Sequence, residues 1–181
     1  MTALTITSLS GAMLLLAIEC SVETSSDAVD RMIAEGLAEQ IVNEVLTKRF
    51  AAIGASPLDK GFGRSATEAQ GSGRERYNDT DDFYNFTALP AEGVWGESLG
   101  TGNDAGVARN ANFCVPAGYF QRWRQRVEVY FVNATNPSVR LTSGTSFYRA
   151  VEVNIEYVDA QGVVKPLARR RRVYAYIPPP A

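Results

Sequence analysis

The feature that most constrains this chain is its first fifty residues, which contain no proline and carry helical periodicity. Residues 1–18 form an apolar, uncharged run, and residues 28–50 continue with apolar side chains at helical spacing. A pattern of this length predicts one long helix over 1–53, or two nearly continuous ones. We expect this helix to be an apolar anchor to about residue 19 and amphipathic beyond it.

In the amphipathic part, apolar residues recur every four positions and predict the helix face that packs on the rest of the protein. The expected helix–sheet packing face consists of Val29, Ile33, Leu37, Ile41 and Val45. A neighbouring apolar row consists of Ala34, Ala38, Val42 and Leu46. Charged residues such as Glu35 and Glu39 fall largely outside both rows, as expected for a face in water.

The apolar run has three interpretations: a membrane anchor, a cleaved secretory signal, or a helix buried in a soluble core. A bilayer-spanning helix needs about 20 mostly apolar residues, and Glu19 ends this run. No Lys or Arg precedes the run, which argues against a secretory signal. We favour the anchor, whose expected membrane and assembly residues are Leu4, Ile6, Leu14, Leu15, Leu16 and Ile18.

Composition excludes several classes of function. The 181 residues include no histidine, which excludes Ser-His-Asp and Cys-His catalysis and His-ligated zinc. A net charge of −2 gives no reason to expect a nucleic-acid partner. Of the two cysteines, Cys20 lies at the end of the apolar run and Cys114 lies in the second half of the chain, so no disulfide framework is implied. We expect a chain that is not an enzyme and needs no cofactor.

Residues 54–181 predict a globular domain, with irregular loops over 54–125 and an antiparallel sheet over 126–177. Alternating apolar and polar residues predict strands at 126–132, 148–158 and 170–177, and the segment Asp159-Ala-Gln-Gly162 predicts a hairpin turn. Because the apolar face of the long helix is the one large surface that can cover such a sheet, the expected fold class is α+β, with the helix packed on the sheet.

Three carboxylates lie close together in sequence at Asp79, Asp81 and Asp82, among several aromatic residues. Such carboxylates could ligate calcium, but the spacing lacks the glycine and the distant glutamate of an EF-hand loop. We favour a cluster of Asx turns over packed aromatic side chains, with calcium as the alternative.

The basic run Arg169–Arg172 also has two interpretations. It could meet membrane headgroups or an acidic partner, or it could belong to an edge strand. Lys and Arg on an edge strand discourage aggregation. We favour the edge strand, with its charges opposed to Glu152 and Glu156 on the neighbouring strand.

A family resemblance is carried by the long helix that is apolar and then amphipathic, and by segments 34–45, 77–83, 118–120, 127–129, 148–149 and 172–174. In these features the chain resembles the type IV pilin family, and more specifically the minor prepilin-like proteins of type II secretion and of the mannose-sensitive haemagglutinin pilus. The family's basic leader, ending in Gly before Phe-Thr-Leu-x-Glu, is not in this sequence. We expect either a true start upstream of Met1 or a chain that prepilin peptidase does not process.

The resemblance implies a minor pilin or pseudopilin-like structural subunit with a single membrane-spanning helix. It implies location in the bacterial inner membrane before assembly, with the globular domain in the periplasm or on a filament surface. The implied partners are other pilin-like subunits, which contact the N-terminal helix. The alternative function is a membrane-tethered periplasmic domain that binds a ligand or a cation through the acidic loop.

Overall fold

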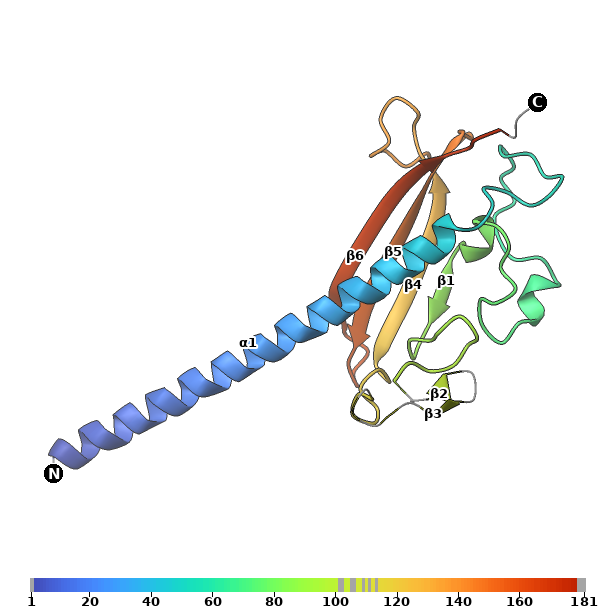
Figure 1. Cartoon of the computed structure of the whole chain (residues 1–181). Helices are drawn as coiled ribbons and strands as arrows, with labels where there is room; N and C mark the ends of the chain where they lie inside the picture. The colour runs from blue at the N-terminus through green and yellow to red at the C-terminus, as the bar shows by residue number, and fades with distance from the viewer. Residues whose placement is uncertain are drawn as a thin grey trace.

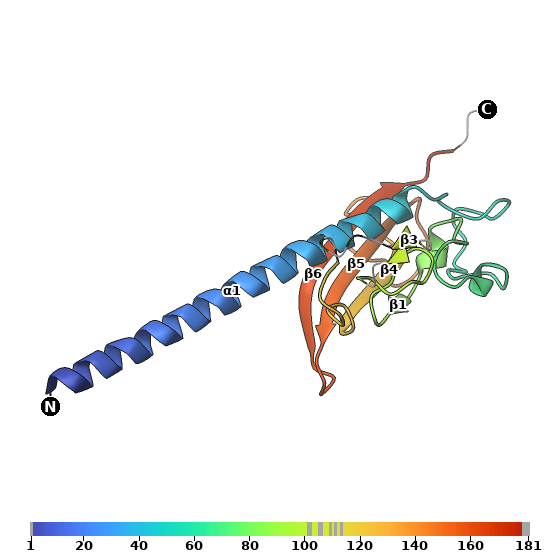
Figure 2. The same ribbon diagram turned by 60° about the horizontal axis from the view of Figure 1, so that its bottom comes forward.

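The fold is α+β, as predicted, with one long helix packed against a four-stranded antiparallel sheet (Figure 1). This computed structural model describes residues 2–100, 103–104, 107–108, 110, 112 and 114–178, and the side chains of the helix from Met13 onward. The helix, α1, spans Thr2–Leu46. Its C-terminal part lies across the sheet, whereas its N-terminal part extends beyond the globular domain (Figures 1 and 2).

The main sheet has the strand order β1-β4-β5-β6, and every neighbouring pair is antiparallel. Its strands are β1 (Phe86–Ala88), β4 (Trp123–Phe131), β5 (Tyr148–Val158) and β6 (Val164–Ala175). A separate short pair consists of β2 (Asn103–Asp104) and β3 (Val107–Ala108). The long strands β4, β5 and β6 follow one another in the chain and in space, which confirms the predicted meander.

The three predicted strands are present, with β5 at the predicted bounds. β4 begins at Trp123 and β6 at Val164, both earlier than predicted, because each strand pairs with β5 over nearly its whole length. The predicted hairpin turn joins β5 to β6. In this turn the Asp159 amide donates to the Val163 carbonyl at 3.0 Å, and Gly162 has the positive φ, +82°, that favours glycine.

The helix is one continuous element and does not restart at the polar segment 24–27. The Thr24 hydroxyl donates to the Cys20 carbonyl at 2.7 Å, and the Ser25 hydroxyl donates to the Ser21 carbonyl at 2.9 Å. Hydroxyl groups that bond back to the preceding turn in this way leave the helix intact. Four polar residues in sequence therefore do not interrupt α1.

The helix ends at Leu46, before the predicted end at residue 53. Beyond this point the chain turns to pair with a loop from later in the sequence. The Arg49 amide donates to the Asn78 carbonyl at 3.3 Å, and the Thr80 amide donates to the Arg49 carbonyl at 2.9 Å. The backbone N–H and C=O groups of Arg49 are therefore hydrogen-bonded to this loop and not within a further turn of the helix.

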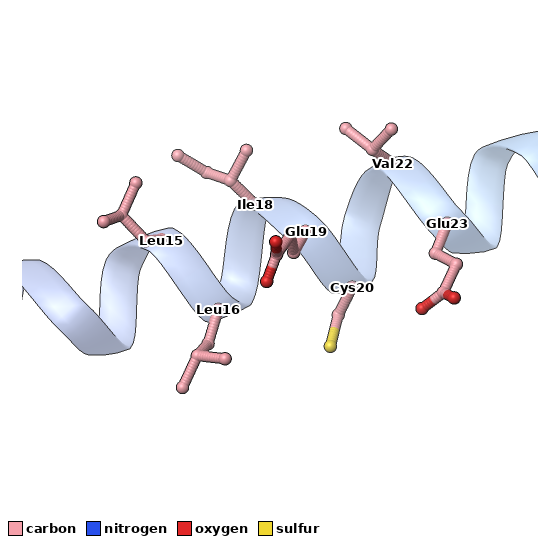
Figure 3. A pocket seen from close by; sticks show the side chains of 7 residues that line it. All are labelled: Leu15, Leu16, Ile18, Glu19, Cys20, Val22 and Glu23. Carbon is pink, nitrogen blue, oxygen red and sulfur yellow. The ribbon is translucent and has the colours of Figure 1, made fainter.

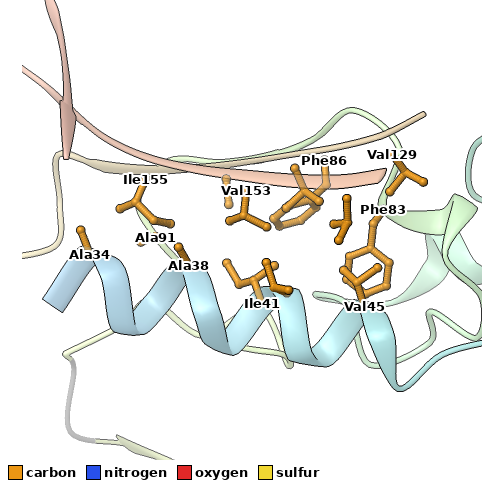
Figure 4. Packing of buried hydrophobic residues seen from close by; sticks show 14 of the residues in the cluster. Ala34, Ala38, Ile41, Val45, Phe83, Phe86, Ala91, Val129, Val153 and Ile155 are labelled. Atoms are coloured by element: carbon orange, nitrogen blue, oxygen red, sulfur yellow. The ribbon is translucent and has the colours of Figure 1, made fainter. Parts of the chain in front are cut away.

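The hydrophobic core lies between α1 and the sheet face that the helix covers (Figure 4). The helix contributes side chains that are at most 2% exposed: Ala34, Ala38, Ile41, Val42 and Val45. The sheet contributes fully buried side chains from its two central strands: Val127, Val129, Val151, Val153 and Ile155. Figure 4 shows Ala38 and Ile41 facing Val153, with Phe83 beside Val45 at the end of the core.

The predicted packing face is correct at its C-terminal end and wrong at its N-terminal end. Ile41 and Val45 are buried, and Ile33 and Leu37 are half-buried against the core. Val29, by contrast, is 53% exposed. A row with a four-residue step turns by about 40° around the helix at each step, so Val29 lies about 160° around the axis from Val45 and faces away from the sheet. For the same reason Leu46, the last member of the neighbouring row, is 39% exposed.

The basic run on β6 divides between the two faces of the sheet, because successive residues of a strand point to opposite sides. On the outer face, Arg169 pairs with Glu152 at 2.9 Å, as predicted for an edge strand. Glu156 does not meet the basic run and pairs instead with Arg124 at 2.6 Å.

On the helix side, Arg170 lies 3.0 Å from Glu35, and Arg172 lies 3.5 Å from Glu39. Glu35 remains exposed, as predicted, whereas Glu39 is half-buried. They nevertheless face the edge of the sheet and form a charged border along the helix–sheet interface.

Candidate functional site

Three carboxylates converge beside the C-terminal end of α1. Oxygen atoms of Glu68, Asp79 and Asp82 all lie within 4.8 Å of one another. Glu68 begins a short 3-10 helix (Glu68–Gln70), and Asp82 lies in a second one (Asp81–Phe83). Asp79 and Asp82 are each only 2% exposed, so two of the three carboxyl groups are largely shielded from bulk water.

Backbone amide groups hold the carboxylates in place. The amides of Asn78 and Asp79 both donate to the Asp82 carboxylate, at 2.8 and 3.2 Å. The Asp81 amide donates to the Asp79 carboxylate at 3.1 Å, which is an Asx turn. Tyr77 and Phe83 pack edge to face below this loop, with ring centroids 4.9 Å apart. The predicted Asx turn over packed aromatic side chains is therefore confirmed.

Burial and mutual repulsion shift the protonation of the two buried aspartates. Burial raises the pKa of Asp79 to about 7, assisted by a hydrogen bond with Asp81 and by the charges of Asp81 and Asp82. Burial raises the pKa of Asp82 to about 6, and neighbouring Glu68 adds to this effect against the amide hydrogen bonds. A buried carboxylate that lacks a counter-charge prefers its neutral form.

The third member, Glu68, has a different environment. Partial burial would raise the pKa of Glu68, but hydrogen bonds from the Ser65 hydroxyl and amide outweigh it, so that the pKa is lowered. The Ser65 amide donates to the Glu68 carboxylate at 2.7 Å, and the Asn78 side-chain amide donates to its other oxygen. Glu68 therefore loses its proton more readily than a free glutamate does, in contrast to the two aspartates.

The group borders a cavity of about 230 Å³ between residues 51–65 and the acidic loop. Arg149 and Asp81 also line this cavity, and the Arg149 guanidinium lies 3.0 Å from the Asp81 carboxylate. This ion pair compensates Asp81 and leaves the other three carboxylates to be compensated by protons or by a cation.

The structure therefore changes the membership of the predicted acidic cluster. Asp79 and Asp82 remain, Asp81 turns to Arg149, and Glu68 takes its place. Oxygen ligands of this kind suit calcium or magnesium. Sequence reasoning missed Glu68, although the spacing Ser65-x-x-Glu68 is the signature of a capping box that orients a glutamate.

The second candidate surface is the part of α1 that extends beyond the domain. Its predicted assembly residues from Leu14 onward are exposed, with Leu15 the most exposed at 68%. Figure 3 shows Leu15, Ile18 and Val22 pointing to one side of the helix, and Leu16, Cys20 and Glu23 to another. An apolar surface of this length in water marks a contact site.

Leu4 and Ile6 lie in α1, but their side chains fall outside the described part of the structure. In the part of the chain that the structure describes, no helix combines the length and apolar character needed to cross a membrane. Comparisons with protein-family models, with curated proteins and with solved structures found no match for this chain.

Proposed function

We propose that this chain is a pilin-like structural subunit that joins a filament of the type IV pilus or type II secretion class. The observation that carries the proposal is the division of α1. Its C-terminal part is buried against the sheet, whereas its N-terminal part leaves the domain with exposed apolar side chains (Figure 1). A monomer gains nothing from such a segment, because exposed apolar surface is unfavourable in water.

In this proposal the part of α1 that extends beyond the globular domain, called the bare segment, mediates assembly. It anchors the chain in the bacterial inner membrane before assembly and then packs laterally against the helices of other pilin-like subunits. The sheet domain faces the periplasm or the filament surface, and no catalytic turnover takes place. The proposal is supported by the fold and by the resemblance of the segments described above to minor prepilin-like proteins.

The anchoring step is tested with Leu15→Arg. Arginine at the centre of a membrane helix costs about 2.5–3.5 kcal/mol on insertion. We expect Leu15→Arg to shift the full chain from the membrane fraction to the soluble fraction and to remove it from sheared filaments. Thr24→Arg, which adds the same charge outside the apolar run, is the control. Unchanged fractionation and unchanged filament content of Leu15→Arg would contradict the proposal.

A second candidate function, cation binding by a membrane-tethered periplasmic domain, is favoured by the convergence of Glu68, Asp79 and Asp82. Calcium would then raise the melting temperature of the full chain, and a chelator would reverse the rise. Glu68→Gln would abolish the response, whereas Asp81→Asn would keep it. If calcium does not change the melting temperature and the chain is still recovered in filaments in normal amounts, cation binding is refuted and the structural role remains.

A further inference from the structure

Strand β6 lies at one edge of the main sheet and is 12 residues long (Figure 1). It pairs with β5 on one side, and among the described residues no strand lies on its other side. Such an edge presents a row of unpaired N–H and C=O groups, which can pair with a strand from another chain.

The hydrogen-bond register identifies the backbone groups that point away from β5. The Tyr176 amide donates to the Phe147 carbonyl at 2.8 Å, so these residues form a hydrogen-bonded pair. Opposed residues of an antiparallel ladder alternate between hydrogen-bonded and non-bonded pairs. The register of β5 and β6 is regular from this end to the irregularity after Ile155. The residues whose N–H and C=O groups point outward, called the free edge, are therefore Arg169, Arg171, Val173 and Ala175.

The hairpin end of β6 is protected against strand addition, whereas the free edge is not. The Asp159 amide donates to the Val163 carbonyl at 3.0 Å, so the alternation places the nitrogen of Pro166 away from β5. Proline has no N–H to offer at this position. Prolines and bulges are common protections of sheet edges, and both occur here only at the hairpin end of β6. The four residues of the free edge keep their outward N–H groups.

Arginine side chains on the free edge set the charge of a suitable partner. Arg169 is 65% exposed and pairs with Glu152 on the outer face of the sheet. The Arg171 guanidinium donates to two neutral groups, the Tyr130 hydroxyl at 3.0 Å and the Pro137 carbonyl at 2.6 Å. Within the described ranges, no carboxylate forms an ion pair with Arg171. This arginine therefore gives the edge a positive charge that the chain leaves uncompensated.

The other two arginines of β6 do not remove this surplus. Arg170 lies 3.0 Å from Glu35 on α1. Arg172 is 56% exposed, and its distance from Glu39 is 3.5 Å. Both carboxylates are thus taken by arginines on the helix side of the sheet, and neither faces Arg171 on the outer side.

The same arginines argue against a second copy of β6 as the occupant. Two paired copies of β6 would bring two arginine runs side by side, and like charges across neighbouring strands destabilise a sheet. An extended segment with carboxylates at alternate positions would place them beside Arg169 and Arg171 on the outer face. Its backbone would also pair with the free edge, so hydrogen bonds and charge favour the same occupant.

We propose that the free edge of β6 binds an extended segment of a different protein as a fifth strand, and that this segment carries Asp or Glu at alternate positions. Main-chain hydrogen bonds supply affinity in strand addition, and alternate side chains supply specificity. The interaction uses the sheet, so it does not depend on the assembly role proposed above for α1.

The test uses the full chain and three labelled peptides, with binding followed by fluorescence anisotropy. Glu and Thr alternate in the first peptide, which puts all carboxylates on one face of a strand. The second peptide has Lys in place of Glu. The third keeps Glu but carries an N-methyl group on every residue, which removes its backbone donors. We expect only the first peptide to bind well, and its affinity to fall as salt screens the charges.

The edge is tested with Val173→Pro. Because the Val173 N–H points away from β5, proline should leave the ladder between β5 and β6 intact while removing one donor of the free edge. We expect Val173→Pro to weaken binding of the Glu peptide about tenfold. Val173→Thr, which keeps the N–H and a β-branched side chain, is the control and should retain binding. Urea denaturation checks that both variants fold.

The charge preference is tested with Arg171→Glu, which should also weaken binding of the Glu peptide about tenfold through like-charge repulsion. The control, Arg122→Glu, makes the same change beside β4, which β5 separates from the free edge, and should retain binding. If Val173→Pro does not fold, Arg171→Glu and the N-methylated peptide decide the question.

Four results would overturn the inference. Equal binding of the Glu peptide to folded Val173→Pro and to Val173→Thr would show that the free edge is not the contact. Equal affinities of the N-methylated and unmodified Glu peptides would rule out strand pairing. Equal affinities of the Glu and Lys peptides, or of Arg171→Glu and Arg122→Glu for the Glu peptide, would refute the charge preference. Failure of the Glu peptide to bind the unchanged chain would refute strand addition itself.

Discussion

The guanidinium of Arg74 forms a two-pronged ion pair with the carboxylate of Glu44 on α1, with nitrogen–oxygen distances of 3.1 Å in both arms. Arg74 is 2% exposed and Glu44 is 12% exposed. The pair joins the last turns of the helix to the loop that leads into the acidic cluster. It therefore fixes the helix end against the part of the domain that lacks regular strands.

This pair predicts a large loss of stability on removal of one partner. Glu44→Ala should lower the free energy of unfolding by about 3–5 kcal/mol, because buried Arg74 would lose its two-pronged partner and keep only the longer 4.0 Å contact with Glu92. Asp27→Ala removes an exposed pair with Lys165 and should cost at most about 1 kcal/mol. Urea denaturation of both variants measures the difference, and similar small losses would refute the buried role of Arg74.

The two faces of α1 predict opposite sensitivities to truncation. Ile41→Ala should cost about 2–5 kcal/mol of unfolding free energy, since Ile41 is buried against the sheet. Val29→Ala should change it by no more than about 0.5 kcal/mol, since Val29 is exposed. Chemical denaturation under identical conditions compares them. Equal costs at the two positions would mean that Ile41 and Val29 do not lie on different sides of α1, one buried and one exposed.

The acidic cluster predicts a pH dependence of stability. The folded-state pKa of Asp79 is raised from 3.8 to about 7 and that of Asp82 from 3.8 to about 6. Between the unfolded-state pKa of 3.8 and these raised values, the folded state binds more protons than the unfolded state. The stability that the two protonated groups contribute is therefore lost as the pH rises through their folded-state pKa values. The free energy of unfolding should accordingly be higher at about pH 5.5 than at about pH 8.

The matched variant for this pH dependence is the double change Asp79→Asn, Asp82→Asn. It keeps the acceptor oxygens but removes the titration, so its stability should vary less over the same pH range. Urea denaturation at each pH is the measurement. Glu128 and Glu152 counteract the trend at lower pH, because hydrogen bonds and charges from arginines outweigh burial and lower their pKa values. A slope that persists in the double variant would assign the effect to other groups.

Buried Arg149 predicts that arginine and lysine are not interchangeable beside the cluster. Its guanidinium donates to Thr80 at 3.1 Å and to Asp81 at 3.0 Å, and it lies over the Phe50 ring at 4.3 Å. Lysine has neither the planar fork nor the same stacking. Arg149→Lys should cost about 1–3 kcal/mol, measured by thermal or chemical unfolding. Arg169→Lys, on an exposed side chain, should be nearly neutral and serves as the control.

Periodicity explains how much of the fold could be predicted. The strands β4, β5 and β6 alternate clearly between apolar and polar residues, and the turn residues between β5 and β6 are those that a hairpin needs. The short strand β1 escaped prediction because three residues, Phe86–Ala88, carry too little pattern. Its position depends on pairing with β4, which is a tertiary effect.

The orientation of α1 and the membership of the acidic cluster could not be predicted for related reasons. Apolar residues occupy two sides of the helix, so the pattern alone does not say which side meets the sheet. Ala34 and Ala38 are weaker hydrophobic signals than Val29, yet they lie on the same side of the helix as buried Val45, whereas the four-residue row turns Val29 away from it. Glu68 lies far from Asp79 in sequence, and an irregular loop brings them together.

If the exposed N-terminal part of α1 becomes covered when the chain assembles, Cys20, which is exposed on this part, should become protected. In a Cys114→Ser background, the reaction rate of Cys20 with a polar maleimide would be measured in the purified chain and in sheared filaments. We expect rapid labelling of Cys20 in the purified chain and strong protection of Cys20 in filaments. Equally rapid labelling of Cys20 in filaments would contradict this expectation.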